Sequence, residues 1–205
     1  KTKEEILKSF DVPAKMKIFT YEGEKDTIMK PTDSIIYYKH MLQTGMMAME
    51  PRSGHIKAWV GGVNYKYFQY DHVGQGARQV GSTFKPFLYA TAIEQLGMSP
   101  CDSIIDSYFT MPKGKWGIDK EKKTKNSDGN YRGTTTLQKA LANSINTVSA
   151  KLIDRVGPQA VVDMAKELGV TSDIPVQPSI ALGAVDITVE QMVGAMSTFA
   201  NQGVY

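Results

Sequence analysis

The chain is poor in the residues that build covalent cross-links and metal sites. Its 205 residues include one cysteine, Cys101, which cannot form an internal disulfide. The three histidines, His40, His55 and His72, are scattered and lack the spacing of metal ligands. We therefore expect neither a disulfide framework nor a metal site.

The chain also lacks a long apolar run and a strong excess of one charge. No stretch approaches the roughly 20 apolar residues that span a bilayer, and no signal segment opens the chain. Its 24 basic and 21 acidic residues leave a net charge of +3, which is too small to predict binding to nucleic acid or to an anionic membrane. The chain begins at Lys1 without Met, so we expect it to be part of a longer protein with any anchor or export signal upstream.

Two stretches could still suggest a binding surface. Residues 120–125 (KEKKTK) form the one basic cluster, which is interpreted as a solvated loop. The aromatic side chains of Tyr65, Tyr67, Phe68 and Tyr70 could stack on nucleic acid bases, but a structured loop is the simpler interpretation. The sequence therefore predicts no nucleic-acid partner.

Hydrophobic residues make up 41 % and charged residues 22 % of the chain, which predicts a packed core. Residues 1–45 are interpreted as a leader region. It is predicted to contain a strand at residues 15–21, a turn at Gly23 and Glu24, and a helix at residues 32–43 with Thr32 as its N-cap. A hairpin follows, with strands at residues 46–49 and 56–60.

Helices are more frequent in the rest of the chain. Residues 63–79 are predicted to form a surface loop, and residues 98–133 are rich in turn-forming residues. Helices are predicted at residues 84–96, 137–142, 148–155, 159–168 and 188–200. Thr188 and Gln191 have the spacing of a capping box at the last of these helices. Strands followed by a run of helices indicate an α+β fold, with residues 46–205 as the main domain.

The segment from Ser82 to Lys85 (STFK) combines a candidate nucleophile with a candidate base. It lies where a loop containing Gly81 passes into an apolar helix, so the serine should be exposed near free backbone N–H groups. Positions i and i+3 share a helix face, which brings the lysine within reach of the serine hydroxyl. The pattern alone, however, favours a simpler interpretation, in which Ser82 caps the helix and Lys85 is solvated.

A lysine can act as a base only when it is neutral. With an ordinary pKa of about 10.4, only about one lysine in 2,500 is neutral at pH 7. Burial or a nearby cation can lower that pKa by several units. The apolar residues Phe87, Leu88, Ala92 and Ile93 follow Lys85 along the helix, and we expect them to bury it.

A second candidate element is Ser144-Ile145-Asn146, between two predicted helices. A serine there could pass a proton between nucleophile and leaving group. An asparagine amide offers one acceptor and two donors, which suits a peptide backbone. S-x-N is a common pattern, and alone it indicates only a cap at the junction of two helices.

Together, the two elements resemble the class A penicillin-binding proteins in their transpeptidase domain. S-x-x-K with an S-D-N element and K-T-G is the motif set of penicillin-binding proteins and class A β-lactamases. Residues 78–87 (RQVGSTFKPF) are similar to the family's region around the active serine. Similar segments also occur at residues 47–54, 61–65, 126–146, 181–183 and 198–203. Residues 6–38 are similar to the linker that precedes the transpeptidase domain.

The sequence departs from the family pattern at three places. Ile145 replaces the Asp of S-D-N, which argues against a class A β-lactamase. Val80 stands where the family usually has proline. No K-[TS]-G is present, since Arg52-Ser53-Gly54 lies in the first hairpin turn, before the serine. The family's third motif lies on a later strand, so we expect this stretch alone to lack one wall of the site and to be inactive.

The resemblance implies a partial penicillin-binding transpeptidase (β-lactamase-like) fold, with strands from the edge of an antiparallel sheet and a mostly helical subdomain. It implies a peptidoglycan D,D-transpeptidase that works by serine acyl transfer without a cofactor. The roles it implies are Ser82 as nucleophile, Lys85 as base, Ser144 as proton relay and Asn146 as a substrate-binding residue.

The resemblance further implies peptidoglycan stem peptides as substrates and β-lactams as covalent ligands. The parent protein would be anchored at the outer face of the bacterial cell membrane, with a glycosyltransferase domain upstream. Three alternatives stay open: a D,D-carboxypeptidase, a β-lactamase, and a non-catalytic β-lactam-binding sensor or scaffold. A β-lactamase is disfavoured because no E-x-x-L-N follows Asn146.

Overall fold

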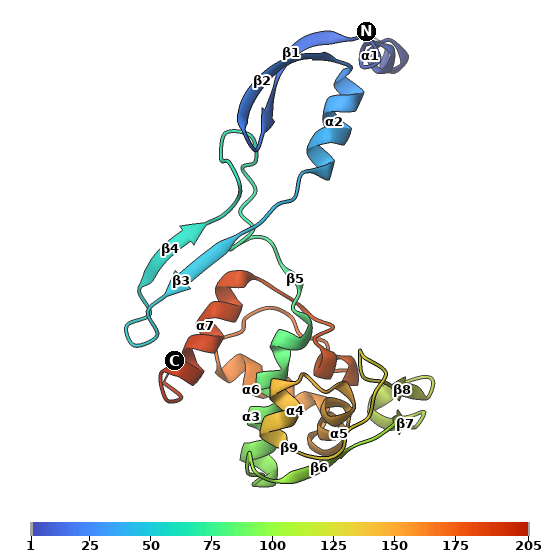
Figure 1. Cartoon of the computed structure of the whole chain (residues 1–205), viewed down its shortest axis with the longest axis vertical. Helices are drawn as coiled ribbons and strands as arrows, with labels where there is room; N and C mark the ends of the chain where they lie inside the picture. Colours follow the sequence, from blue (N-terminus) through green and yellow to red (C-terminus); the bar gives the residue numbers. More distant parts are fainter. Residues whose placement is uncertain (1, 205) are drawn as a thin grey trace. The chain divides into compact units, whose positions relative to one another are not determined.

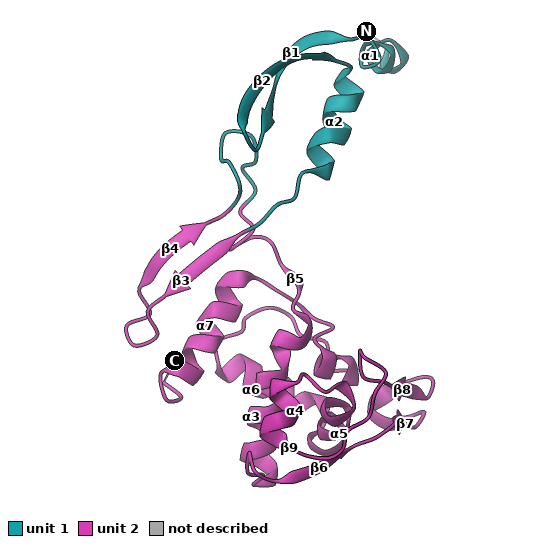
Figure 2. Ribbon diagram, in the orientation of Figure 1, with its two compact units in different colours: residues 1–44, 62–70 teal, residues 45–61, 71–205 magenta. Residues whose placement is uncertain are grey.

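The computed structural model describes residues 2–204. The chain forms two compact units (Figure 1, Figure 2). Unit 1 comprises Lys1–Thr44 and Gly62–Tyr70, and unit 2 comprises Gly45–Gly61 and Asp71–Tyr205. The sequence did not suggest that residues 62–70 join the leader region, and the division between residues 45 and 46 stays a prediction.

Unit 1 starts with helix α1 (Lys3–Ser9), followed by the antiparallel strands β1 (Ala14–Thr20) and β2 (Gly23–Met29). The strand predicted at residues 15–21 is confirmed within one residue. The turn predicted at Gly23 and Glu24 is wrong, because both residues belong to β2 and the turn lies at residues 21–22. Strand β2 escaped prediction because its charged residues have low strand propensity and only its pairing with β1 holds them extended.

Helix α2 (Pro31–His40) completes the leader. Thr32 is not its N-cap as predicted, because Pro31 takes the first helical position and Lys30 becomes the N-cap. Proline suits that position, since its missing N–H group would have no partner there. The Thr32 hydroxyl instead donates to the carbonyl oxygen of Phe10 at 2.7 Å.

Aromatic rings pack together in unit 1. Phe19 of β1 stacks on Tyr67 with ring centres 5.2 Å apart, and Tyr38 of α2 meets Phe68 edge to face at 5.7 Å. The Tyr38 hydroxyl also accepts a hydrogen bond from the Phe19 N–H group at 2.9 Å. These contacts hold residues 62–70 on the hairpin and agree with the interpretation of this stretch as a structured loop.

Unit 2 begins with the predicted hairpin of β3 (Met46–Met49) and β4 (Ile56–Val60), which are antiparallel with an irregularity between Ala48 and Met49. Strand β3 packs against helix α7 (Val189–Ala200). The two-residue strands β5 (Arg78–Gln79) and β10 (Asp186–Ile187) form a second antiparallel pair.

The core of unit 2 is helical. Helix α3 (Lys85–Leu96) packs against α4 (Leu137–Ala142), α5 (Asn146–Val156) and α6 (Pro158–Glu167), as the lower part of Figure 1 shows. The largest fully buried apolar side chains include Phe84, Phe87, Leu88, Leu137, Ile145, Leu152, Ile153 and Ile180. The five helices predicted beyond residue 83 are confirmed, with small shifts at their ends. Ile93 is exposed, however, and does not help to bury Lys85 as expected.

The capping box predicted at the start of α7 is only half formed. The Thr188 hydroxyl accepts from the Gln191 N–H group at 3.3 Å, as expected. The Gln191 side chain does not return to Thr188. Its carbonyl oxygen accepts instead from the N–H groups of Thr171 and Ser172, at 3.0 and 2.8 Å, and so ties the preceding loop to α7.

The turn-rich stretch at residues 98–133 contains short strands that the sequence did not predict. Strand β6 (Ser103–Asp106) pairs with β9 (Gly133–Thr136), and β7 (Phe109–Met111) pairs with β8 (Lys122–Thr124). The solvated-loop interpretation of residues 120–125 is therefore corrected, although Lys122 and Lys123 are exposed.

Helices combined with antiparallel strand pairs confirm the predicted α+β class. None of the helices formed by residues 2–204 is long and apolar enough to cross a membrane.

Candidate active site

Ser82 lies in the short 3-10 helix η1 (Gly81–Phe84), which continues into α3. Its side chain is exposed, whereas Phe84 and Lys85 are buried. The backbone N–H group of Lys85 donates to the Ser82 carbonyl oxygen, so the two residues are joined by one tight helical turn. The chain therefore passes from an exposed hydroxyl to a buried amine within three residues.

Lys85 is only 1 % exposed, and its amine meets three oxygen acceptors. Its Nζ donates to the Ser144 carbonyl oxygen at 2.7 Å, to Ser144 Oγ at 2.9 Å and to Asn146 Oδ1 at 2.8 Å. These bonds match the three donors of an ammonium group. Three of the four predicted residues are therefore in direct contact.

Burial lowers the pKa of Lys85 to about 8. At that value about one lysine in ten is neutral at pH 7, compared with about one in 2,500 at the ordinary pKa. The three acceptors favour the ammonium form and so oppose the effect of burial. Lys85 is thus placed to change between its charged and neutral forms near neutral pH.

Ser82 is close to this cluster in sequence but is not bonded to its amine. Among residues 2–204, no hydrogen bond joins Ser82 Oγ to Lys85 Nζ. Two of the three acceptors of Lys85 are instead oxygen atoms of Ser144, which also lines the pocket. The structure therefore places Ser144 between the amine and the pocket that Ser82 lines.

Ser144 lies at a sharp turn between α4 and α5. Its φ is 52°, a left-handed conformation that is unfavourable for residues other than glycine. The turn is closed by the Ser144 N–H group donating to Leu141 O and the Ile145 N–H group donating to Ala140 O, both at 2.9 Å. This backbone directs both the carbonyl and the hydroxyl of Ser144 at Lys85.

Asn146 is the first residue of α5. Its contacts differ from those expected of a substrate-binding residue. Its Oδ1 accepts from Lys85, and its Nδ2 donates to the carbonyl oxygen of Lys125 at 3.4 Å. It is not among the residues that line the pocket beside Ser82. In this structure Asn146 holds the amine, and its contact with a substrate stays a prediction.

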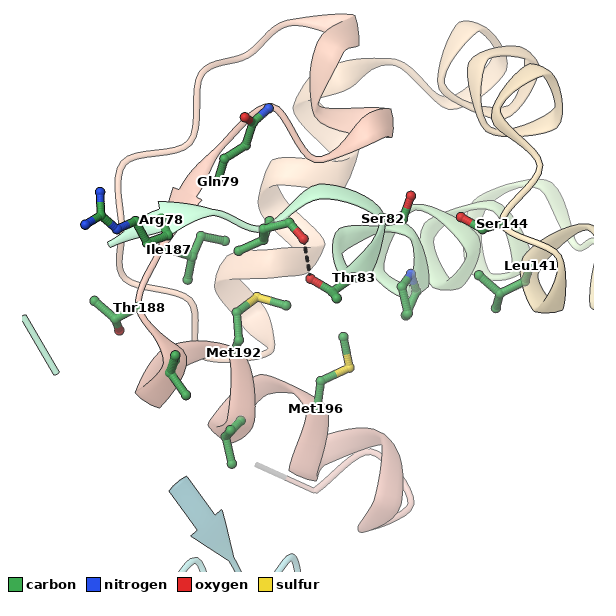
Figure 3. A pocket seen from close by; sticks show the side chains of 14 residues that line it. Arg78, Gln79, Ser82, Thr83, Leu141, Ser144, Ile187, Thr188, Met192 and Met196 are labelled. Atoms are coloured by element: carbon green, nitrogen blue, oxygen red, sulfur yellow. Dashed lines mark hydrogen bonds between the residues drawn. The ribbon is translucent and has the colours of Figure 1, made fainter. Parts of the chain in front are cut away.

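An open pocket of about 870 Å³ lies beside Ser82 (Figure 3). Ser82, Thr83 and Ser144 line its wall with hydroxyl-bearing side chains. The Thr83 hydroxyl donates to the Val80 carbonyl oxygen at 2.6 Å, and this bond is drawn as a dashed line at Thr83 in Figure 3. Most of the remaining wall is apolar. It includes Val80, Pro86, Leu141, Ile187, Met192 and Met196. Such a wall offers an apolar surface beside the three hydroxyl groups.

Two glycines fix the backbone in front of Ser82. Gly81 has φ 56° and donates its N–H group to the Gly183 carbonyl oxygen at 3.1 Å. Gly183 follows the 3-10 helix η3 (Pro178–Leu182) with φ 73°, and a Cβ atom there would lie 1.8 Å from the Gly81 oxygen. In the sequence, residues 181–183 resemble a segment of the family, but the resemblance assigns them no role. The structure gives Gly183 the role of a brace for η1.

Val80, the departure from the family pattern, belongs to the same brace. Its N–H group donates to the Val185 carbonyl oxygen at 3.0 Å. Proline has no N–H group and could not make this bond. The valine thus adds one backbone bond between the loop before Ser82 and the segment after η3.

Sequence reasoning missed three buried polar residues behind the site. Asp106, Asn126 and Thr147 are at most 7 % exposed, and each bonds to the others or to the first turn of α5. The signal that could have found them is their polarity at positions that the fold buries. That signal requires the tertiary structure, because the three residues are spread over about forty positions.

The chemistry of the site is that of hydroxyl, amide and amine groups. Within the part of the chain that the structure describes, no group of three or more His, Cys, Asp or Glu side chains could hold a metal ion. An exposed serine beside a buried amine with a lowered pKa suits nucleophilic catalysis through a covalent intermediate.

Comparison with known families decides the chain's relationship. A family profile described as the penicillin binding protein transpeptidase domain matches residues 44–205. The chain belongs to the penicillin-binding protein transpeptidase family. A second profile, the penicillin-binding protein middle domain, matches residues 1–42 of the chain. The resemblance inferred from the S-x-x-K and S-x-N motifs is confirmed.

Curated relatives of the chain are named penicillin-binding protein 1A. The protein from Aquifex aeolicus is 36 % identical over 165 residues, which are 79 % of this chain and 22 % of that protein. The protein from Neisseria flavescens is 36 % identical over 164 residues, or 80 % of this chain and 20 % of that protein. The chain therefore spans about a fifth of the length of these relatives.

Solved structures support the same fold. Penicillin-binding protein 1A from Haemophilus influenzae superposes with a TM-score of 0.72 at 29 % identity, covering 78 % of this chain and 23 % of that one. PonA1 from Mycobacterium tuberculosis superposes with a TM-score of 0.67 at 25 % identity, covering 100 % of this chain and 54 % of that one. PonA1 has also been solved in complex with penicillin V. The predicted penicillin-binding transpeptidase fold is confirmed.

Proposed function

We propose that this chain carries the serine acyl-transfer site of a peptidoglycan D,D-transpeptidase. One observation carries the proposal above the others. A buried amine with a lowered pKa, Lys85, is held by Ser144 and Asn146 one helical turn from the exposed hydroxyl of Ser82. Family membership supports the substrate class, which is the D-Ala-D-Ala end of a stem peptide.

The first step is acylation. Ser82 Oγ attacks the carbonyl carbon of the penultimate D-alanine, and its proton passes to neutral Lys85. The tetrahedral intermediate then collapses, the C–N bond breaks, and the terminal D-alanine leaves as an amine. Ser144 Oγ, 2.9 Å from Lys85 Nζ, is placed to give its proton to that amine and take one back from the lysine.

The second step transfers the acyl group. An amine from a neighbouring stem peptide attacks the Ser82 ester, and its proton returns through Ser144 to Lys85. The new amide bond is the cross-link, and Ser82 Oγ recovers its proton as the ester bond breaks. A β-lactam enters the same first step, because its strained amide occupies the place of the scissile bond and stays attached to Ser82.

The alternatives share the first step and differ in the second. A carboxypeptidase would use water as the acceptor, a β-lactamase would hydrolyse the ester fast, and a sensor would keep it. No contact of the described residues favours one of them over transpeptidation. The upstream glycosyltransferase domain, the membrane anchor and the outward-facing location remain predictions from the resemblance.

The proposal is tested by labelling the complete gene product with a fluorescent penicillin, with Ser82→Ala and the adjacent Thr83→Ala as matched variants. We expect a stable covalent adduct in the wild type and in Thr83→Ala, and none in Ser82→Ala. Label that persists in Ser82→Ala would assign the nucleophile elsewhere. Rapid release of the label would indicate a β-lactamase instead.

A second assay separates cross-linking from trimming. A stem peptide with a D-Ala-D-Ala end is supplied together with an amine acceptor, and the products are identified by mass spectrometry. We expect the acceptor adduct to exceed the hydrolysed product. We expect the 205-residue chain alone to label slowly, because it contains no K-[TS]-G sequence.

A further inference from the structure

Helix α5 begins without a cap of its own. Its N-cap residue is Ile145, whose side chain makes no capping bond. Asn126, twenty positions earlier in the chain, supplies the missing acceptor. Its Oδ1 accepts from the N–H groups of Asn146 and Thr147, at 3.0 and 3.1 Å. The first turn of α5 is therefore capped from outside by a residue of another loop.

The orientation of Asn126 is itself fixed. Its Nδ2 donates to Asp106 Oδ1 and to the Asn130 carbonyl oxygen, both at 2.8 Å. With both amide protons used, Oδ1 must face α5. Asn126 is 7 % exposed, so water does not compete for these bonds.

Asp106, at the end of β6, anchors the arrangement. It is 1 % exposed and accepts from the Thr147 hydroxyl, from Asn126 Nδ2 at 2.8 Å and from the Arg132 N–H group at 2.9 Å. Burial alone would raise the pKa of Asp106, but these donors outweigh it and the pKa is lowered. The carboxylate is thus a buried negative charge beside the positive end of α5.

This arrangement bears directly on the amine of the site. Asn146 donates its backbone N–H group to Asn126. The side-chain oxygen of Asn146 accepts from Lys85 Nζ at 2.8 Å. Ser144, two residues earlier, is in the left-handed conformation, which persists only where its surroundings impose it. A shift of the first turn of α5 would move all three acceptors of Lys85 together.

We propose that Asp106 and Asn126, with the Thr147 hydroxyl, form a clamp that positions the Ser144–Asn146 turn against Lys85. The clamp touches neither the nucleophile nor the pocket, so its members are positioning residues. The proposal rests on the proposed acyl transfer, since its kinetic effect is on that reaction. It assigns the clamp to the acylation step and not to binding of the β-lactam.

The test uses the complete gene product and a fluorescent penicillin, with the acylation rate constant and the initial dissociation constant measured separately. Thr147→Val keeps the side-chain volume and removes only the hydroxyl, whereas Thr147→Ser keeps the hydroxyl. We expect Asp106→Asn and Thr147→Val to slow acylation about 10- to 100-fold with little change in initial binding. Thr147→Ser should acylate faster than Thr147→Val.

A destabilised control in another helix separates positioning from folding. Val161→Ala creates a cavity at a fully buried side chain of α6, which carries none of the clamp residues. Melting temperatures are measured for every variant. If Val161→Ala slows acylation as much as a clamp variant of equal melting temperature, the clamp is merely structural and the proposal is overturned. If Asp106→Asn does not fold, the proposal is tested with Thr147→Val alone. Acylation of Thr147→Val at the wild-type rate would then overturn the proposal.

A readout independent of labelling distinguishes failure of the clamp from failure of the proposed function. Carbon-13 NMR titration of Lys85 reports its pKa directly. In Thr147→Val and Asp106→Asn the displaced turn takes the three acceptors away from the amine, so the ammonium form loses stabilisation and the midpoint should fall below about 8. An unmoved midpoint refutes the clamp, whereas labelling that survives in Ser82→Ala refutes the acyl-transfer assignment alone.

Discussion

Lys85 combines two opposing influences on one amine. Burial disfavours its ammonium form, and the oxygens of Ser144 and Asn146 favour it. A purely apolar site would leave the amine neutral but unable to hold a proton taken from Ser82. An exposed amine would hold its proton too firmly to act as a base. The observed balance suits a group that must accept and return a proton in each half-reaction.

The pH dependence of acylation should follow the neutral form of Lys85. Because burial lowers the pKa of Lys85 to about 8, the neutral fraction of Lys85 rises steeply with pH below 8 and levels off above it. We expect the acylation rate to increase about tenfold per pH unit below the pKa and to level off above it. The check is a series of labelling rates between about pH 6 and 9.5, and a flat profile would exclude Lys85 as the base.

Replacing Lys85 by arginine removes the base while keeping the charge. Arginine stays protonated at any accessible pH, so Lys85→Arg should slow acylation by about 10²- to 10⁴-fold. Lys151 offers a matched control, because its Nζ also donates to a carbonyl oxygen and a serine hydroxyl, Ile105 O and Ser107 Oγ. Lys151→Arg should acylate at the wild-type rate. Equal losses in both variants would show that the effect is not specific to the site.

At the scale of elements, the local sequence was sufficient to predict α3 but insufficient to predict the short strands of residues 98–133. Its apolar run and the left-handed Gly97 at its end are local signals, and they predicted the helix that carries Ser82 and Lys85. The short strands of residues 98–133 depend on partners far along the chain. For the same reason the sequence could pair the motifs by resemblance but could not find Asn126, whose polar side chain gains its role only when β6 and α5 meet.

The contact between η3 and η1 gives a prediction at this scale. In Gly183→Ala the new Cβ would meet the Gly81 carbonyl oxygen, and φ of 73° is itself unfavourable for alanine. We expect a loss of about 1–3 kcal/mol in the free energy of unfolding and a further fall in acylation as Gly81 displaces Ser82. Both are measured by chemical denaturation and penicillin labelling.

Helix α7 supplies the control for that substitution. A Cβ atom on Gly194 would meet nothing within 4 Å, and alanine is the better helix former by about 1 kcal/mol. Gly194→Ala should therefore keep or raise stability and leave acylation unchanged. If Gly183→Ala behaves in the same way, η3 does not brace the nucleophile.

At the scale of the whole chain, the predicted chemistry lies within a single unit. Ser82, Lys85, Ser144, Asn146 and the clamp residues all belong to unit 2. Unit 1 has its own means of holding the chain together, since residues 62–70 return to its hairpin through aromatic packing and through Glu24. That carboxylate accepts from Lys66 and Tyr67 and pairs with Lys17 at 3.4 Å. Loss of these bonds should therefore destabilise unit 1 and leave the site in unit 2 unchanged.

Glu24→Gln tests this division of the chain. Hydrogen bonds from Lys66 and Tyr67 lower the pKa of Glu24 to about 2, so its stabilising effect is complete above the ordinary value of about 4.5 and is lost as the pH falls toward 2. In the wild type, amide exchange at residues 62–70 should accelerate over that pH range. In Glu24→Gln it should be fast already at pH 7, and Glu22→Gln in the adjacent turn should resemble the wild type. Penicillin labelling of Ser82 should be equal in all three, because Lys17, Lys66 and Tyr67, the partners of Glu24 among the described residues, all belong to unit 1. A parallel loss of labelling would show that the two units are coupled.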